Sequence, residues 1–236
     1  MSALMVVQSG RGTAIETPCH LHHLHVNEWG PPWIANFYER IFRPDDVRHG
    51  EWWGEPAIEF GQTRMVVARP RAAEKKNAAG LWHFGWGRLS FGQSYKDHLD
   101  LEASRDTPIA VGDAPFHLHL HSTDGAGACH WYEQTLGASC TASDEPWQGE
   151  IDDERVPPSA IATFSNVALA FYDVFEDVMI ESSPGHPYDH LAFACWAIDG
   201  FDGANASGPI GVRAGVKFRR LDGPDGIAIE LIEAVD

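Results

Sequence analysis

One order of elements, a strand followed by a helix and then by further strands, recurs along the chain and constrains the fold more than any other feature. A unit of this kind cannot bury its apolar surface alone, so we expect the units to pack against one another. The second unit, residues 81–113, is too short to hold its last strands and is predicted to be truncated. The opening strands are predicted at residues 19–26, 81–89, 116–121 and 190–196.

The elements after the opening strands have their own signals. An amphipathic helix is predicted over residues 33–42 and another over 126–136, where Gly137 suits a left-handed C-cap. Residues 161–172 are predicted as one strand. The chain closes on two strands joined by an Asp-Gly-Pro-Asp-Gly turn at residues 222–226. Together these elements predict an α+β fold.

Charge limits the partners that such a chain can bind. The formal net charge is -17 and the pI is near 5.0. An acidic chain repels phosphates, so nucleic acid and anionic membranes are not expected partners. No apolar stretch is long enough to cross a bilayer and the start has no secretory pattern, so a cytoplasmic protein is expected. The cysteines form no CxxC pair and are predicted to be reduced, packed thiols: Cys19, Cys129, Cys140 and Cys195.

Histidines and glutamates stand where strands bury their side chains. His117, His119 and His121 share one face of a predicted strand, because side chains alternate along a strand. Imidazoles are costly to bury unless they are bonded, and they are the commonest transition-metal ligands. Glu230 lies between apolar neighbours in the closing strand, and a buried carboxylate needs a partner. His190 is followed on its own face by small alanines, which leaves room for a ligand.

Three motifs in this order resemble the vicinal-oxygen-chelate superfamily, which includes glyoxalases, bleomycin-resistance proteins and extradiol dioxygenases. Residues 116–137 resemble its first strand and helix, with His117, Asp124, Trp131-Tyr132 and Leu136-Gly137 at the matching positions. Asp189-His-Leu-Ala-Phe193 resembles the first strand of the partner module. Residues 223–233 resemble the closing hairpin, with the ligand glutamate at Glu230. The N-terminal part matches less closely, at residues 20–42 and 83–86.

The resemblance implies repeated βαβββ modules whose curled mixed sheets surround one metal ion. Residues 1–112 would form a truncated, degenerate domain, and residues 113–236 a metal-binding domain of two modules. In this family each module gives one ligand from its first strand and one from its last. That rule implies a divalent ion, Fe, Mn, Co, Ni or Zn, with these ligands: His117, Glu181, His190 and Glu230.

Roles for the remaining residues follow from the same resemblance. Glu181 and Glu230 are candidate catalytic acids and bases at the metal. His119 is a candidate proton shuttle or substrate contact, or a cavity histidine without a chemical role. His23 and His25 could form a second metal site with His83, but a structural N-terminal domain that shapes the mouth of the site is the favoured interpretation.

Several activities occur in this family. The favoured hypothesis is an isomerase or lyase of the glyoxalase I or epimerase type, which moves a proton next to a metal-chelated carbonyl. An Fe(II) extradiol dioxygenase is the first alternative, although Arg220 and Gly223 stand where those enzymes have Tyr and His. A drug-binding protein without activity is the other. The expected partner is a small oxygenated molecule, and a homodimer is as plausible as a monomer.

Overall fold

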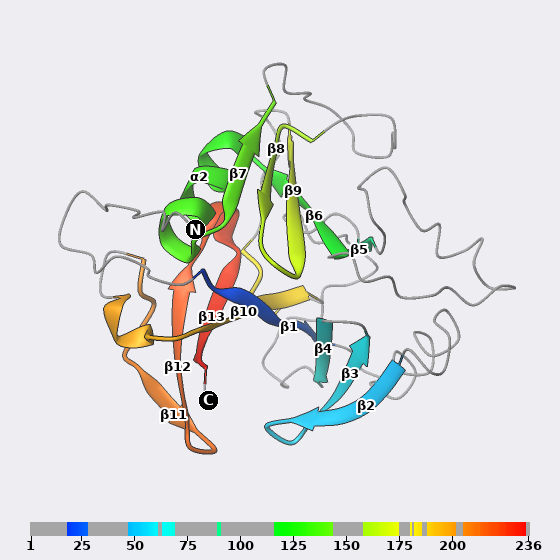
Figure 1. The fold of residues 1–236 in the computed structure, drawn as a ribbon, viewed down its shortest axis with the longest axis vertical. Helices are drawn as coiled ribbons and strands as arrows, with labels where there is room; N and C mark the ends of the chain where they lie inside the picture. The colour runs from blue at the N-terminus through cyan, green and yellow to red at the C-terminus, as the bar shows by residue number, and fades with distance from the viewer. Residues whose placement is uncertain are drawn as a thin grey trace, which may run out of the picture.

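The computed structural model consists mainly of β-strands in two curled mixed sheets (Figure 1). It describes residues 18–27, 47–60, 63–68, 89–90, 116–143, 158–174, 180, 182–185, 188–201 and 205–234. The helix predicted over residues 33–42, and also His83 and Glu181, lie outside these ranges. No helix of the described part has the length and apolar character needed to span a membrane.

The larger sheet joins the N-terminal and C-terminal parts of the chain. Its eight strands are arranged in the order β11-β12-β13-β10-β1-β4-β3-β2. Their bounds are β1 His20–Asn27, β2 Val47–Trp52, β3 Glu55–Phe60, β4 Thr63–Ala68, β10 Tyr188–Cys195, β11 Gly211–Arg213, β12 Val216–Asp222 and β13 Ala228–Glu233. The 3-10 turns η3 Ile198–Gly200 and η4 Pro224–Gly226 flank the C-terminal strands.

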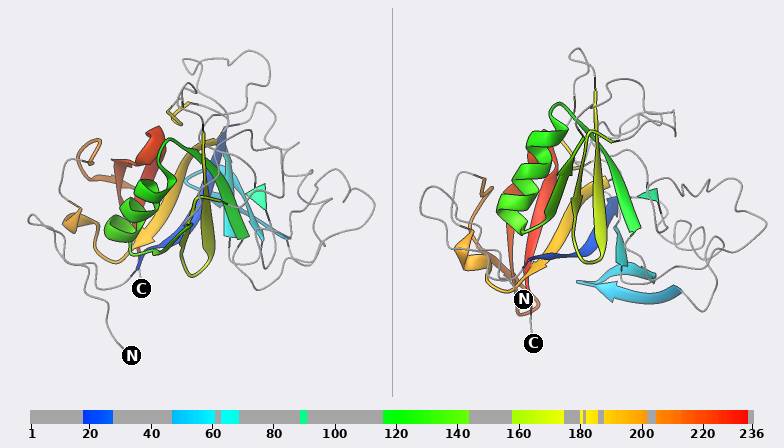
Figure 2. Two further views of the ribbon diagram at one scale, coloured as in Figure 1. Left: turned by 90° about the horizontal axis from the view of Figure 1, so that it is seen from above. Right: turned by 45° about the horizontal axis from the view of Figure 1, so that its top comes forward.

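The smaller sheet has the order β5-β6-β9-β8-β7 and is packed against the described helix, α2 Gly125–Leu136 (Figure 2). Its strands are β5 Leu89–Ser90, β6 Phe116–Ser122, β7 Ser139–Ala142, β8 Ala160–Thr163 and β9 Val167–Asp173. A bend at Phe164–Asn166 divides the predicted strand 161–172 into β8 and β9, because Phe164 N–H bonds to Val167 O and turns the chain back.

One strand order occurs three times in these sheets. In each set the first strand along the chain pairs parallel with the fourth. The fourth then pairs antiparallel with the third, and the third with the second. The three sets are β1-β4-β3-β2, β6-β9-β8-β7 and β10-β13-β12-β11. The first and third of these sets form one sheet because β1 pairs antiparallel with β10. The larger sheet therefore crosses the boundary predicted after residue 112, and the set beginning at β6 lies in the other sheet.

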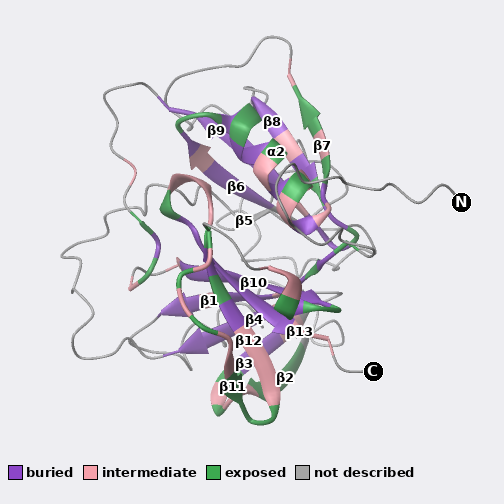
Figure 3. Ribbon diagram, turned by 90° about the vertical axis from the view of Figure 1, so that its left-hand side faces the viewer, coloured by how far each residue is buried: buried purple, intermediate pink, exposed green. Residues whose placement is uncertain are grey.

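The hydrophobic core lies between α2 and the two sheets (Figure 3). Leu118 and Leu120 of β6 and Tyr132 of α2 are completely buried there. The Tyr132 ring also reaches β10, where its centroid is 6.5 Å from that of Phe193. One face of the larger sheet is therefore apolar and covered, which leaves polar side chains of β10 and its neighbours to the opposite face.

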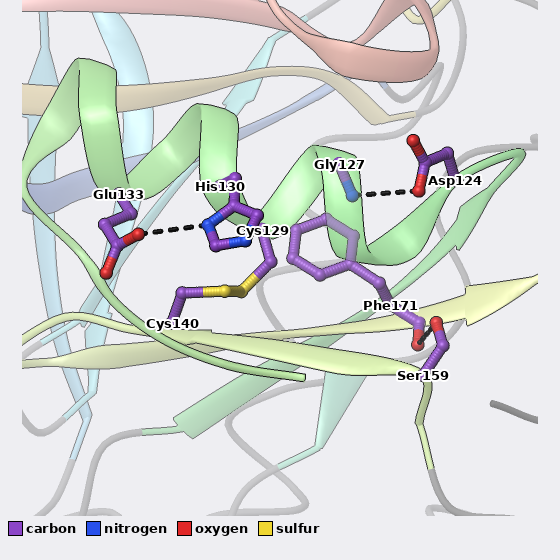
Figure 4. The surroundings of a disulfide bond; sticks show 8 residues. All are labelled: Asp124, Gly127, Cys129, His130, Glu133, Cys140, Ser159 and Phe171. Carbon is purple, nitrogen blue, oxygen red and sulfur yellow. Dashed lines mark hydrogen bonds and ion pairs between the residues drawn. A yellow bond between two sulfur atoms is a disulfide. The ribbon is translucent and has the colours of Figure 1, made fainter. Parts of the chain in front are cut away.

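Both ends of α2 follow the sequence prediction. The Asp124 carboxylate accepts a hydrogen bond from Gly127 N–H, which caps the first turn (Figure 4). Gly137 adopts φ 78° and closes the last turn, so the predicted left-handed C-cap is confirmed.

The four cysteines form two disulfides, and the prediction of reduced thiols was wrong. Cys129 of α2 is bonded to Cys140 of β7 (Figure 4). Cys19 is bonded to Cys195, because the antiparallel register of β1 and β10 pairs His20 with Ala194 and brings the next residues together. The sequence did not reveal either pair, since strand pairing and helix packing bring the cysteines together only in the fold.

Candidate metal centre

An irregularity in β1 sets which of its side chains leave the core. Leu21 pairs with Phe193 of β10, whereas His23 pairs with Ala192, so the register shifts by one residue between them. In a regular strand Leu21 and His23 would share a face. The shift keeps Leu21 and Leu24 in the core and turns His23 and His25 to the opposite face.

Strand register then brings three strands' side chains together. His25 of β1 pairs directly with His190 of β10. Ala192, two residues after His190, pairs with Glu230 of β13. The strands β1, β10 and β13 are neighbours in the larger sheet (Figure 1). By this register His25, His190 and Glu230 share one face of it.

The distances between these groups suit a metal centre. The rings of His25 and His190 are stacked with centroids 4.4 Å apart, and the His23 centroid lies 5.6 Å from that of His190. One ring nitrogen from each of the three histidines lies within 4.8 Å of the others. The Glu230 Oε1 atom is 3.8 Å from His190 Nε2.

The surroundings of the His190 Nε2 atom indicate whether a metal ion fits this site. This nitrogen is buried, and it makes no hydrogen bond among the described residues. An unpaired buried nitrogen is costly, whereas imidazole nitrogens and a carboxylate are good ligands for divalent transition metals. The three imidazoles of the cluster could therefore hold a divalent ion, and the Glu230 carboxylate lies next to one of them.

Asp189 fixes the orientation of the His190 ring. Its Oδ1 atom lies 2.5 Å from His190 Nδ1, and its Oδ2 atom accepts hydrogen bonds from Asn27 Nδ2 and Gly185 N–H. Burial alone would raise the pKa of Asp189, but the hydrogen bond from His190 and the Gly185 N–H lower it below its usual value. An ionised carboxylate only accepts hydrogen bonds, so His190 carries a proton on Nδ1, and Nε2 is the atom that would bind a metal.

The other histidines of the cluster are neutral. Burial, and next the neighbouring His190, lower the pKa of His25 from 6.5 to about 3. The same two causes hold the pKa of His23 well below its ordinary value. Neutral imidazole is the form that binds a metal, so these rings need not lose a proton first.

Arg220 and several aromatic side chains lie beside the histidine cluster. The half-exposed Arg220 has its Nε atom 3.7 Å from Glu230 Oε2. Trp52 lies 4.3 Å from His22, centroid to centroid, and is stacked on Trp53. The ring centroid of Trp53, which follows β2, is 5.5 Å from that of Phe218 of β12.

The predicted site residues are distributed over both sheets. His190 and Glu230 lie together as described. The backbone of His117 belongs to β6, in the smaller sheet. His119 is buried on β6 with its ring 5.1 Å from that of Tyr172. Glu181 lies outside the described residues.

His23 and His25 were not among the four ligands predicted from the sequence. The sequence favoured a structural role for the N-terminal domain that contains them. The available signal was their spacing of two residues, which is the spacing shared by His117 and His119. Their partner comes from a strand near the other end of the chain.

No protein-family model matches the chain, and no curated protein sequence matches it. Among solved structures, oxidase ChaP-H1 is 18% identical, with a TM-score of 0.34 over 50% of this chain and 94% of that one. Oxidase ChaP-H2 is 14% identical, with a TM-score of 0.35 over 50% and 91%. A xylose isomerase-like TIM barrel/4-hydroxyphenylpyruvate dioxygenase fusion protein is 12% identical, with a TM-score of 0.31 over 93% of this chain and 33% of that one. Similarity this low does not bear on activity.

Proposed function

We propose that the chain is a metal-dependent enzyme of the vicinal-oxygen-chelate type, with a divalent ion held by His25, His190 and Glu230. The observation that carries this proposal is the buried, unpaired Nε2 atom of His190 beside the carboxylate of Glu230. The threefold recurrence of one strand order supports the modular interpretation.

The composition of the site favours oxygen chemistry over proton transfer. Two histidines and one carboxylate are typical of non-haem Fe(II) oxygenases. A proton-transfer site of the glyoxalase type would take a second carboxylate from the matching strand of the other module. Glu230 pairs with Ala192, which is two residues after His190. The equivalent residue two after His25 is Asn27, and it pairs with Ala68. The N-terminal set of strands therefore supplies no carboxylate at that position.

The protein residues have separate tasks in this proposal. A bound ion would supply charge and open positions that chelate two neighbouring substrate oxygens. Asp189 holds the His190 ring so that its electron pair is available. Arg220 provides a positive charge near Glu230 that suits an acidic substrate. Trp52 and Trp53 form an apolar wall beside the cluster.

Metal content distinguishes this centre from the one inferred from the sequence. Untagged protein prepared without chelators should contain one metal ion per chain by mass spectrometry. His190→Ala and His25→Ala should lose it, while His117→Ala and the exposed His130→Ala should retain it. Loss in His117→Ala with retention in His25→Ala would contradict the proposal.

Two activity assays separate the reaction classes. Fe(II)-loaded protein should consume oxygen with catechols of different substitution, and Glu230→Gln should abolish this. Proton exchange on 2-oxoaldehyde thiol adducts without oxygen uptake would instead support the isomerase alternative. Metal binding with neither reaction over a wide substrate range would favour a binding protein.

A further inference from the structure

His23 belongs to the same cluster as His25 and His190, and distance alone would make it a third histidine ligand. Its hydrogen bonds decide otherwise. They run from Glu59 through Arg64 and His22 to His23, across β3, β4 and β1. Each donor in this series can be identified from chemistry.

Arg64 fixes the direction of the series. Its Nε atom donates to Glu59 Oε1 at 2.8 Å, and its guanidinium lies over the ring of Trp52 at 5.4 Å. Its Nη1 atom is 3.2 Å from His22 Nε2. A guanidinium group has only donors, so His22 Nε2 accepts and the ring proton of His22 must be on Nδ1.

His22 then determines the tautomer of His23. The two Nδ1 atoms are 2.9 Å apart. Because His22 carries its proton there, it donates, and His23 Nδ1 accepts. An imidazole that accepts at Nδ1 is neutral and carries its proton on Nε2. His190 is the opposite case, since its Nδ1 proton is bonded to Asp189 and its Nε2 atom lies beside Glu230 as the atom that would bind a metal.

From this series we infer that His23 is not a metal ligand but a hydrogen-bond donor to an oxygen atom of the molecule bound at His25, His190 and Glu230. The inference rests on the proposed metal site and deepens it. Ligation through His23 Nδ1 would displace the proton of His22. Ligation through Nε2 would move the His23 proton to Nδ1, where His22 already donates. Either change leaves the partly buried Nδ1–H donor of His22 without an acceptor, which is unfavourable.

The tautomers can be observed directly in the metal-free protein. With ¹⁵N-labelled histidine, long-range ¹H–¹⁵N correlation distinguishes a proton on Nδ1 from one on Nε2, and single variants assign the signals. We expect the Nδ1–H form for His22 and His190 and the Nε2–H form for His23. Arg64→Met should change the His22 and His23 patterns, whereas Arg213→Met, which removes a guanidinium over the ring of Trp53, should not. A proton on His23 Nδ1 in the unmodified protein would overturn the inference.

Metal binding tests the ligand question separately. His23→Ala should retain one Co(II) per chain, while His25→Ala and His190→Ala lose it. If all three variants lose the metal, His23 is a ligand and the inference fails while the proposed function stands. If His25→Ala and His190→Ala retain it, the proposed function itself fails.

The donor role is tested with 4-nitrocatechol, a coloured molecule with two neighbouring oxygens. Co(II)-loaded His23→Ala should bind it about threefold to tenfold more weakly than the unmodified protein, as expected for one lost hydrogen bond. Arg64→Met should show part of this loss, and Arg213→Met none. Equal affinity in His23→Ala would show that the His23 proton does not reach the ligand.

Discussion

The orientation of single imidazole rings decides what each histidine of the larger sheet can do. His190 and His23 lie close together on the same face, yet their protons are held on different nitrogen atoms. The partners that hold them are Asp189 for one and His22 for the other. Asp189 and His22 are not themselves proposed to contact the metal or the bound molecule. They nevertheless control which ring can bind a metal and which can donate a hydrogen bond.

Asp189 should be essential for metal affinity although it is not a ligand. In Asp189→Asn the neutral amide no longer fixes the His190 proton on Nδ1, and metal affinity should fall about tenfold to a hundredfold. Isothermal titration with Zn(II) measures this. Asp199→Asn, at an exposed aspartate bonded to Lys217, is the matched control and should bind as the unmodified protein does. An unchanged affinity in Asp189→Asn would show that ring orientation is set elsewhere.

At the scale of elements, the turn between β12 and β13 attaches the two sheets to each other. The Asp225 carboxylate accepts hydrogen bonds from Ser122 Oγ at 2.6 Å, Thr123 N–H at 3.0 Å and Thr123 Oγ1 at 2.7 Å. Asp225 itself has φ 55°, a conformation that few residue types adopt readily. This contact connects the strand that carries Glu230 to the start of α2.

Removing this contact should destabilise the protein. Asp225→Ala leaves three donors without their acceptor, and we expect a loss of about 2 kcal/mol in the free energy of unfolding. Urea denaturation followed by fluorescence measures it. Asp222→Ala, which removes one exposed hydrogen bond with Ser207 in the same region, should cost much less. Equal losses would indicate that solvent replaces the contacts of Asp225.

At the scale of the whole molecule, the Cys19–Cys195 disulfide links the N-terminal and C-terminal strands of the larger sheet. Closing so long a loop restricts the unfolded chain, so reduction should lower the stability by about 2 to 4 kcal/mol. Thermal melts with and without dithiothreitol measure the change. Cys19→Ser/Cys195→Ser should melt lower than the unmodified protein, and its remaining sensitivity to reductant should come from Cys129–Cys140. A melting temperature that reductant leaves unchanged would contradict a stabilising role.

Buried neutral histidines should make the metal-free protein sensitive to acid. Folding lowers the pKa of His22 to about 4 and that of His25 to about 3, from 6.5 in the unfolded chain. Below pH 6.5 the unfolded chain therefore binds more protons, and the free energy of unfolding should fall toward pH 4 by up to about 1.4 kcal/mol per pH unit for each histidine. Above pH 6.5 this contribution is complete. Urea titrations at several pH values measure the slope, which His22→Ala should reduce and the exposed His130→Ala should not.

Local sequence patterns were enough to predict many elements. The α2 helix and its Gly137 cap, β6 and the closing hairpin follow from alternation, periodicity and turn residues, which act between near neighbours. The same local logic indicated that His190 and Glu230 are buried groups in need of a partner. Even the shift in β1 has a local signal, since Leu-His-His-Leu at residues 21–24 breaks the alternation of the strand.

The choice of partners belonged to the tertiary structure. Sequence order suggested that the unit with His117 pairs with the next one. In the structure β10 pairs with β1, and His25 is the residue opposite His190. The disulfide partner of Cys19 was concealed for the same reason. Local patterns fix which residues of a strand face inward, whereas the free energy that selects neighbouring strands comes from the core that they bury together. This core draws on residues from the whole chain. The sequence by itself therefore indicated which side chains can act as metal ligands, and only the fold decided which of them meet.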